Sequence, residues 1–291
     1  MAPSGSPTVR RRRLAAELRR LRGRRTGTEV SRGIGWSPTK ISRAESGRES
    51  IPPEEVEKLL DYYGVDQPLR GHLLALAEDA TARGWWEEYD NVLAPEYAEF
   101  IGLEAEATSI STYQADVVPG VLQTSGYAEQ ISIGYQSVVP TPPGVIDQLV
   151  RVRMIRQQRL TNDPPLHLSA IIDEAVLLRS IGGTPVMRQQ LEHLARVADV
   201  PNVDMRILPL KRDTSIAAGS FSVFSFGSRD SPEAVRIGDI VSTESLKSEL
   251  YIEGEADTYL YLVVFEALAR ASLSREASKD LIRSTAELAW R

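Results

Sequence analysis

The spacing of hydrophobic positions predicts helices through the first 83 residues. Leu14, Leu18 and Leu21 recur at the spacing of one helix face, which predicts a first helix over residues 9–22. The same kind of pattern predicts helices over residues 52–63 and 68–83. Together with two shorter helices between residues 27 and 47, these segments form a first domain of five short helices.

The two short central helices carry clear start and stop signals. The first ends at Gly35, because glycine readily adopts the positive φ that helix ends often require. Ser37 is a good N-cap, and Pro38 suits the first helical position, where its missing N–H loses no hydrogen bond. The second helix therefore begins at Pro38 and runs to Gly47. Two short helices joined by a glycine turn predict a helix-turn-helix unit.

From residue 96 onward the pattern becomes mixed. Helical spacing is found over residues 101–111, 125–135, 143–160, 173–180, 184–199, 256–271 and 275–290. Runs rich in strand-forming residues lie at 166–172, 203–208, 221–226 and 235–240. The predicted fold class is an N-terminal all-α helix-turn-helix domain of five helices followed by a larger α+β domain. We place the first domain at residues 8–83, a connector at 84–95 and an α+β sensing or assembly domain at 96–291.

Composition and charge narrow the function classes. The 291-residue chain is 42% hydrophobic and 25% charged, which is typical of globular proteins. It has no cysteine, no long apolar run and no signal-like start, so we expect a cytoplasmic protein without membrane contact, disulfides or thiolate metal sites. Residues 1–50 hold 13 Lys or Arg against 4 Asp or Glu, whereas the remaining residues hold 21 against 36. This basic segment predicts a polyanionic partner, of which double-stranded DNA is the simplest.

The helix that begins at residue 38 presents a face for DNA. Ile41 and Ala44 point inward by helical spacing, which leaves Thr39, Lys40 and Arg43 on the outward face. Arg and Lys can bind guanine O6 and N7, and Thr can contact a base edge, so these three are the candidate base-reading residues. The candidates for the DNA backbone are hydroxyl and cationic side chains around the unit, namely Ser37, Ser42, Arg22, Arg24, Arg25, Arg32 and Arg48.

The segment from Gly35 to Arg48, GWSPTKISRAESGR, resembles the helix-turn-helix of Xre-type regulators that are abundant in actinomycetes. The resemblance extends over nearly the whole chain, through residues 60–65, 83–86, 102–107, 118–124, 127–128, 173–177 and 201–203. It implies an antitoxin-like transcriptional regulator that is often encoded beside a small acidic partner protein. The family resemblance implies no established ligand or reaction for the C-terminal domain.

The chain departs from that family within the helix-turn-helix unit. The connection after the first helix is shorter than usual, Ser31 stands where an alanine is usual, and Ala44 replaces a larger apolar residue. Gly33 inside a helix costs roughly 0.5 to 1 kcal/mol relative to alanine. Together these departures are expected to weaken the unit by roughly a few kcal/mol, a large share of a typical domain stability.

Related modules tie their first helix to their third through an arginine, and Glu45 is the acidic residue placed for that role here. We predict that Glu45 pairs with Arg22 if the shortened connection is tight. If the first helix shifts its register, the partner is Arg20.

The second domain offers fewer candidates. Tyr113, Gln114 and Gln123 surround a Pro119-Gly120 turn and are candidate ligand-pocket residues, while most of their apolar neighbours are typical of a core. The three histidines are isolated, and there is no recognisable nucleophile, metal or cofactor motif. We therefore assign no catalytic residue, no metal and no cofactor.

Two functional hypotheses remain at this point. The leading one is a sequence-specific DNA-binding transcriptional regulator that acts as a homodimer, because one module reads only a short half-site. The alternative is that DNA binding has been lost, and that the C-terminal domain binds a small molecule or catalyses a cyclase- or isomerase-like reaction in a biosynthetic pathway.

Overall fold

The computed structural model describes residues 7–47, 50–81, 83–134, 140–211, 216–227, 238–244 and 249–291. The chain clusters into two compact units. The N-terminal unit comprises Met1–Glu88 with Ile101–Glu106, and the C-terminal unit comprises Tyr89–Phe100 with Ala107–Arg291. A helical first region followed by a mixed sheet with helices confirms the predicted fold class.

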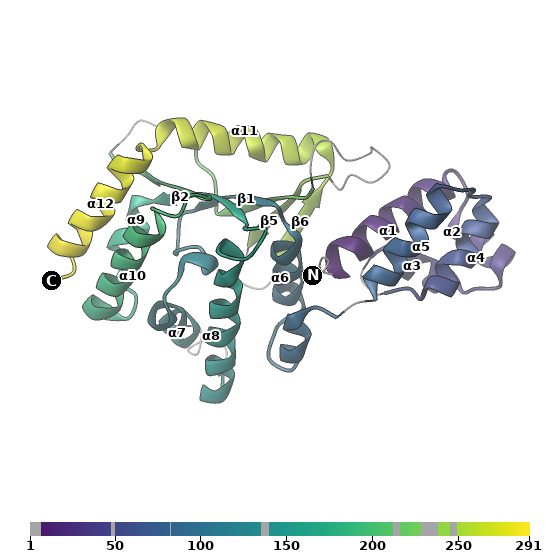
Figure 1. The fold of residues 1–291 in the computed structure, drawn as a ribbon, viewed down its shortest axis with the longest axis horizontal. Coiled ribbons are helices and arrows are strands. Elements are labelled where there is room, and N and C mark those ends of the chain that lie inside the picture. The colour runs from purple at the N-terminus through teal and green to yellow at the C-terminus, as the bar shows by residue number, and fades with distance from the viewer. Residues whose placement is uncertain are drawn as a thin grey trace. The chain divides into compact units, whose positions relative to one another are not determined.

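Five helices build the N-terminal unit: α1 (Pro7–Arg22), α2 (Gly27–Ile34), α3 (Pro38–Ala44), α4 (Pro53–Tyr63) and α5 (Leu69–Ala80) (Figure 1). All five contribute to one apolar core, for example through Leu18, Val30, Ile41, Leu60 and Leu73. These side chains are almost fully buried, so burial of the apolar face of each short helix holds the unit together.

Residues 85–106 follow the five helices. The predicted connector contains the 3-10 helix η1 (Trp85–Tyr89), and α6 (Pro95–Glu106) comes next. The rings of Trp85 and Trp86 meet edge to face, with centroids 5.9 Å apart, and Trp86 is buried. Among the described residues, no helix is both long and apolar enough to cross a bilayer.

A six-stranded sheet in the order β3-β2-β1-β4-β5-β6 forms the centre of the C-terminal unit. Its strands are β1 (Ser109–Gln114), β2 (His167–Asp173), β3 (Val203–Leu208), β4 (Phe221–Ser225), β5 (Ile240–Glu244) and β6 (Glu249–Glu253). The first three pair in parallel, and β4, β5 and β6 continue the sheet in antiparallel order. Parallel pairing requires long crossover connections, and helices supply them here.

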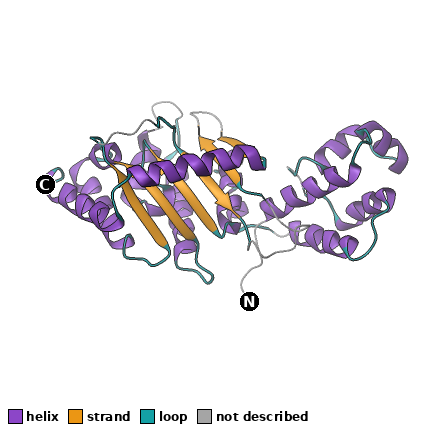
Figure 2. Cartoon of the chain, turned by 90° about the horizontal axis from the view of Figure 1, so that it is seen from above, coloured by secondary structure: helices purple, strands orange, loops and turns teal. Residues whose placement is uncertain are grey.

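The helices of the C-terminal unit lie on both faces of this sheet. The crossover from β1 to β2 contains η2 (Gly120–Leu122), α7 (Ser125–Gly134), α8 (Pro143–Gln157) and η4 (Gln158–Leu160). The crossover from β2 to β3 contains α9 (Glu174–Leu178) and α10 (Gly183–Val197). On the opposite face lies α11 (Glu255–Ala271), which runs across the strands in Figure 2.

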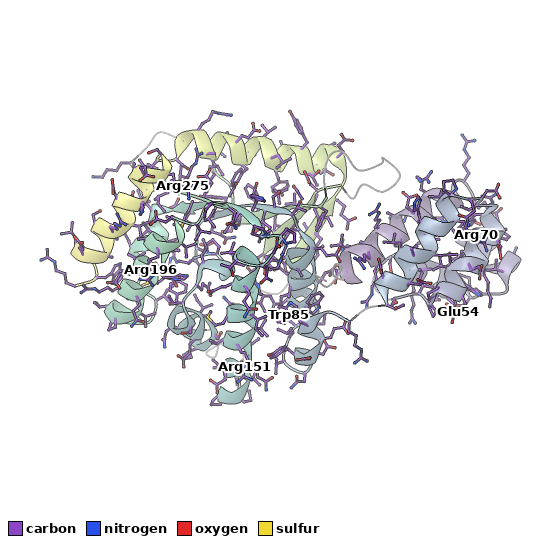
Figure 3. All side chains as sticks on the ribbon, viewed as in Figure 1. Glu54, Arg70, Trp85, Arg151, Arg196 and Arg275 are labelled. Atoms are coloured by element: carbon purple, nitrogen blue, oxygen red, sulfur yellow. The ribbon has the colours of Figure 1, made fainter. Side chains whose placement is uncertain are left out.

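The last helix, α12 (Arg275–Leu288), packs against α10 and β3. Arg275, labelled in Figure 3, donates to the backbone oxygens of Ala198 (2.6 Å) and Val200 (2.9 Å). These bonds satisfy carbonyl groups that follow the end of α10, and they tie the start of α12 to that turn.

Strand β1 corrects the sequence-based prediction of a helix over residues 101–111. Helix α6 ends at Glu106, and Ser109 begins a central strand. Thr112 is buried in the middle of β1, and its polar hydroxyl is satisfied there. The hydroxyl donates to the Phe221 carbonyl oxygen (3.1 Å) and lies 2.9 Å from the Ser222 hydroxyl oxygen. Partners more than 100 residues away therefore allow a polar segment to form the middle of the sheet.

The other strand predictions have mixed outcomes. Strands predicted over 166–172, 203–208 and 221–226 are confirmed to within one residue at each end, whereas β6 has no counterpart in the prediction. Half of the strand predicted over 235–240 falls on residues 235–237, which lie outside the described residues, and β5 begins at Ile240.

Candidate nucleic-acid interface

Helix α3 carries the candidate base-reading residues, and its start is fixed by local sequence. The Ser37 hydroxyl accepts the backbone N–H of Lys40 (3.2 Å), and Pro38 lies in the first turn, as the sequence predicts. Helix α2 ends at Gly35, which has a left-handed backbone with φ of 72°. The turn between the two helices is therefore set by a glycine and by a capping serine.

The orientation of α3 separates its apolar and polar residues as helical spacing predicts. Ile41 and Ala44 are buried in the core of the N-terminal unit. Thr39 and Arg43 are exposed, and Lys40 is partly exposed. The three candidates also line one surface hollow with residues from the start of α4, and its full lining is Trp36, Ser37, Thr39, Lys40, Arg43, Ala44, Ser50, Ile51 and Glu55.

The Lys40 side chain is held in this hollow by two neighbours. Its Nζ donates to Glu55 Oε1 (2.6 Å) and lies 4.3 Å from the centroid of the Trp36 ring. A carboxylate and an aromatic face both attract an ammonium group, so they position Lys40 before any ligand arrives. Sequence reasoning missed Glu55, because acidic residues at the start of a helix indicate only a favourable interaction with the helix dipole.

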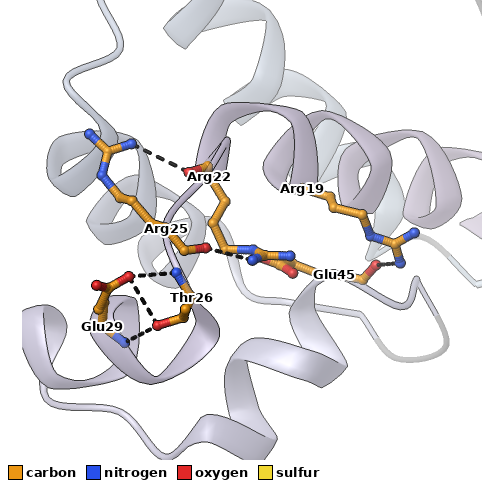
Figure 4. Close-up of polar contacts among 6 residues, drawn as sticks. All are labelled: Arg19, Arg22, Arg25, Thr26, Glu29 and Glu45. Carbon is orange, nitrogen blue, oxygen red and sulfur yellow. Dashed lines mark hydrogen bonds and ion pairs between the residues drawn. The ribbon is translucent and has the colours of Figure 1, made fainter.

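Glu45 joins α1 to the end of α3. Arg22 Nε donates to Glu45 Oε1 (2.8 Å), which confirms the predicted pair in its tight-connection form (Figure 4). Arg19 donates to the backbone oxygen of Glu45 (2.7 Å), and Arg22 also donates to the backbone oxygen of Arg25 (2.6 Å). Arg22, a candidate for the DNA backbone, is thus engaged inside the unit.

Tyr63 lies beside the Arg22–Glu45 pair in an apolar setting. Burial, together with the nearby Glu45 carboxylate, raises the pKa of Tyr63 to about 12. The Arg25 guanidinium lies 5.9 Å from the centroid of its ring. The pair is therefore shielded on one side by an aromatic ring that stays neutral at physiological pH.

The short connection between α1 and α2 is closed by a capping box that sequence reasoning missed. Thr26 donates its backbone N–H to Glu29 Oε2 (2.6 Å), and the backbone N–H of Glu29 donates to Thr26 Oγ1 (3.2 Å) (Figure 4). The spacing of Thr26 and Glu29 is the sequence signature of this motif. Two helix N–H groups that lack intrahelical partners are thereby satisfied directly after the shortened connection.

Gly33 has a packing role that its helix propensity does not reveal. A Cβ atom at this position would lie 2.2 Å from Cε2 of Tyr62 and 2.7 Å from its Cζ. The Tyr62 ring occupies the space that any larger residue would need. Glycine is therefore what allows α4 to approach α2 at this position, a role that stands beside the cost expected from helix propensity.

The remaining backbone candidates occupy different settings. Arg24, Arg25, Arg32 and Ser42 are exposed, whereas Arg48 lies outside the described residues. The Ser37 hydroxyl already accepts the α3 N-cap hydrogen bond. The exposed arginines leave cationic groups on the surface of the N-terminal unit that a polyanion can contact.

The three ligand-pocket candidates do not converge. Tyr113 is buried in the core between the sheet and α11, and its neighbour Gln114 points to the opposite face of β1. Gln123 is 1% exposed, and its amide donates to the Val118 backbone oxygen (2.7 Å) and accepts from Arg153 (2.6 Å). Tyr113 and Gln123 therefore act as core and structural polar residues in the structure.

Comparison with known families gives two matches. A family model described as "Helix-turn-helix domain" matches residues 13–73, which include α2, α3, α4 and the residues lining the hollow. A model described as "Domain of unknown function (DUF5753)" matches residues 97–284. Neither the curated proteins nor the solved structures gave a match.

Proposed function

Because this chain belongs to the family of the domain of unknown function DUF5753 and carries a helix-turn-helix domain ahead of it, we propose that it is a sequence-specific DNA-binding transcriptional regulator. The observation that carries the proposal is the outward face of α3. Thr39, Lys40 and Arg43 line one hollow, and the opposite face of their helix is buried in the core. A short helix with a polar, cationic outer face suits insertion into the major groove.

The charge distribution supports a nucleic-acid partner. Residues 1–50 carry 13 basic against 4 acidic side chains, although the whole chain has a net charge of -6. Phosphate neutralisation by lysine and arginine gives most of the sequence-independent affinity for DNA. We propose Arg24, Arg25 and Arg32 as the phosphate contacts, with Ser37, Ser42, Arg22 and Arg48 as further backbone-facing residues.

The test is selection of binding sites from random DNA, followed by titration at two salt concentrations. Lys40→Ala or Arg43→Ala is expected to cost roughly 1 to 3 kcal/mol on the selected site and much less on random DNA. Arg24→Ala and Arg25→Ala are expected to weaken all sequences alike and to reduce the slope of log affinity against log salt by about one unit each.

The matched control is Lys58→Ala, which removes an exposed positive charge from the same unit at a position outside the hollow. It is expected to leave the sequence preference unchanged. If selection enriches no site, and all five proteins lose the same small affinity, the regulator proposal fails.

Two finer proposals follow from the family resemblance and from the geometry of helix-turn-helix modules. We propose that the regulator is a homodimer, because one module reads a short half-site and paired half-sites raise both affinity and specificity. We further propose an antitoxin-like role with a small acidic partner protein, supported by the basic charge of residues 1–50. Co-expression with a small acidic protein encoded beside this chain tests that role, since a genuine partner would co-purify with the chain and compete with DNA.

A further inference from the structure

Helix α11 is apolar on two sides. Its inner side packs on the sheet, where Leu268 is fully buried and Tyr261, Leu262 and Phe265 are partly buried. Its outer side carries Tyr259, Leu260 and Val263, whose exposed fractions are 65%, 60% and 39%. Large apolar side chains that gather on one exposed face indicate an interaction surface, so the outer side calls for a partner.

The outer residues form one continuous stripe by helix geometry. Ala256, Leu260, Val263 and Ala267 recur at intervals of four, three and four residues, which places them on the same face. Tyr259 lies beside them, three residues after Ala256 and four before Val263. The two alanines are small and allow a second helix to come close at either end. The spacing is that of a helix seam and not of scattered surface residues.

The sheet extends this apolar surface. Leu250 on the edge strand β6 is 60% exposed. It shares a face of the strand with Ile252, two residues further on, which packs in the core beneath α11. Leu250 therefore points to the α11 side of the sheet. Four of the eight large apolar side chains that are exposed within the described residues thus lie on this side of the C-terminal unit.

Charges stand at both ends of the stripe, with opposite sign. Glu255 and Asp257 lie in the first turn of α11, and Arg270 lies in the last turn. Arg270 Nη1 is 3.8 Å from Glu266, and both side chains are about 70% exposed, so this pair is open to a new partner. Two α11 helices in antiparallel order would place each Arg270 near the acidic first turn of the other helix.

We propose that two copies of this chain associate through antiparallel pairing of their α11 helices, with Leu250 at the border of the interface. A two-fold interface must be self-complementary, and this stripe is. Its apolar centre near Val263 would meet itself, and its acidic end would meet its basic end. This interface would join the two subunits of the homodimer proposed above. The inference rests on the proposed function in one respect, namely that a regulator reading two DNA half-sites needs a dimer.

The size of the surface predicts a weak association. A helix of 17 residues is roughly 25 Å long and 10 Å wide, so the stripe alone is smaller than the roughly 800 Å² per partner of a typical stable interface. We expect a dissociation constant on the order of micromolar for the free protein, and stabilisation of the dimer when both copies bind one DNA molecule.

Sedimentation velocity of the full chain over a range of concentrations, without DNA, tests the interface. The unmodified chain is expected to pass from monomer to dimer in the micromolar range. Leu260→Glu is expected to raise the dissociation constant at least tenfold, because it places a charge in the centre of the stripe. The matched control is Leu288→Glu on α12, where the side chain is 67% exposed, and it is expected to leave the constant unchanged. Circular dichroism confirms that both variants are folded.

Charge reversal tests the antiparallel order. Arg270→Glu and Glu255→Lys are each expected to weaken the dimer several-fold, and the double variant is expected to recover most of the loss. If the double variant shows no recovery, antiparallel pairing is excluded and the proposal is overturned. A chain that stays monomeric at about 100 μM also overturns it. So does equal weakening of the dimer by Leu260→Glu and Leu288→Glu. A chain that dimerises through α11 yet selects no DNA site supports this interface and overturns the regulator function instead.

Discussion

Single residues in the N-terminal unit take their roles from neighbours that are distant in sequence. Gly33 leaves room for the ring of Tyr62, which lies on another helix. Lys40 is positioned by Glu55, and Arg22 is held by Glu45. Each of these contacts can be altered by one substitution that changes little else.

The first residue-scale prediction concerns Gly33. Gly33→Ala is expected to destabilise the protein by about 1 to 3 kcal/mol, because the added Cβ atom would overlap the Tyr62 ring. Urea unfolding measures the loss. Gly27→Ala on the same helix is the control, since its Cβ would meet only Ile41 at an ordinary 3.8 Å. In a Tyr62→Ala background the cost of Gly33→Ala is expected to vanish, and an undiminished cost would point to backbone effects instead.

The second residue-scale prediction concerns Glu55. Glu55→Gln removes the carboxylate charge from Lys40, so affinity for all DNA sequences is expected to rise and the preference for the selected site to fall. The slope of log affinity against log salt should steepen by about one unit as the freed ammonium group meets a phosphate. Glu54→Gln makes the same charge change at the adjacent exposed residue. Equal effects of both variants would show that bulk charge, and not the Lys40 contact, is responsible.

At the scale of elements, the two short helices of the candidate interface depend on their caps. Helix α2 has eight residues and α3 has seven, and isolated helices of that length are unstable in water. Their first turns are fixed by backbone N–H groups that donate to the hydroxyls of Thr26 and Ser37, and α2 ends at the left-handed Gly35. With their ends capped in this way, the two helices need burial of only one apolar face each to be stable in the folded unit.

The element-scale prediction is a test of the Thr26 cap. Thr26→Ala is expected to reduce stability by about 1 kcal/mol, because the N–H of Glu29 loses its acceptor. Thr26→Ser keeps the hydroxyl and is expected to restore most of that stability. Urea titrations of the three proteins give the comparison, and similar losses for Ser and Ala would show that the methyl group of Thr26 matters more than its hydroxyl.

At the scale of the whole molecule, charge is divided between a basic start and an acidic remainder. Residues 1–50 have nine more basic than acidic side chains, and the remaining residues have fifteen more acidic than basic ones. One partly buried carboxylate in the C-terminal unit adds a pH dependence. Burial raises the pKa of Glu249 from 4.5 to about 7, although its contact with Ser242 favours the charged form.

The whole-molecule prediction follows from the direction of this shift. The folded state holds the Glu249 proton more tightly than the unfolded state does, so its contribution to stability is complete below pH 4.5 and is lost as pH rises through about 7. After allowance for partial exposure, the change is on the order of 1 to 2 kcal/mol. Urea unfolding between pH 5 and pH 8 measures it. In Glu249→Gln this component of the pH dependence should be absent, and an identical profile would assign it to other groups.

Local signals in the sequence were enough to predict the helix-turn-helix unit. Gly35, Ser37 and Pro38 act through backbone bonds within three or four residues, so their effect does not depend on the rest of the chain. The inward and outward faces of α3 follow from helical period alone. The basic charge of residues 1–50 is also a property of the sequence, and with the unit it pointed to DNA.

Only the tertiary structure decided the contacts between elements. The sequence left Arg20 and Arg22 as alternative partners of Glu45, and packing of α1 selected Arg22. It predicted a helix over residues 101–111, whereas β1 begins at Ser109. The buried hydroxyl of Thr112 in that strand has partners on β4 that no local pattern reveals. The outer face of α11 likewise becomes visible only once the sheet has covered its inner face. The physical reason is the same in each case: local backbone bonds fix an element, whereas its neighbours are chosen by burial and hydrogen-bond partners far along the chain.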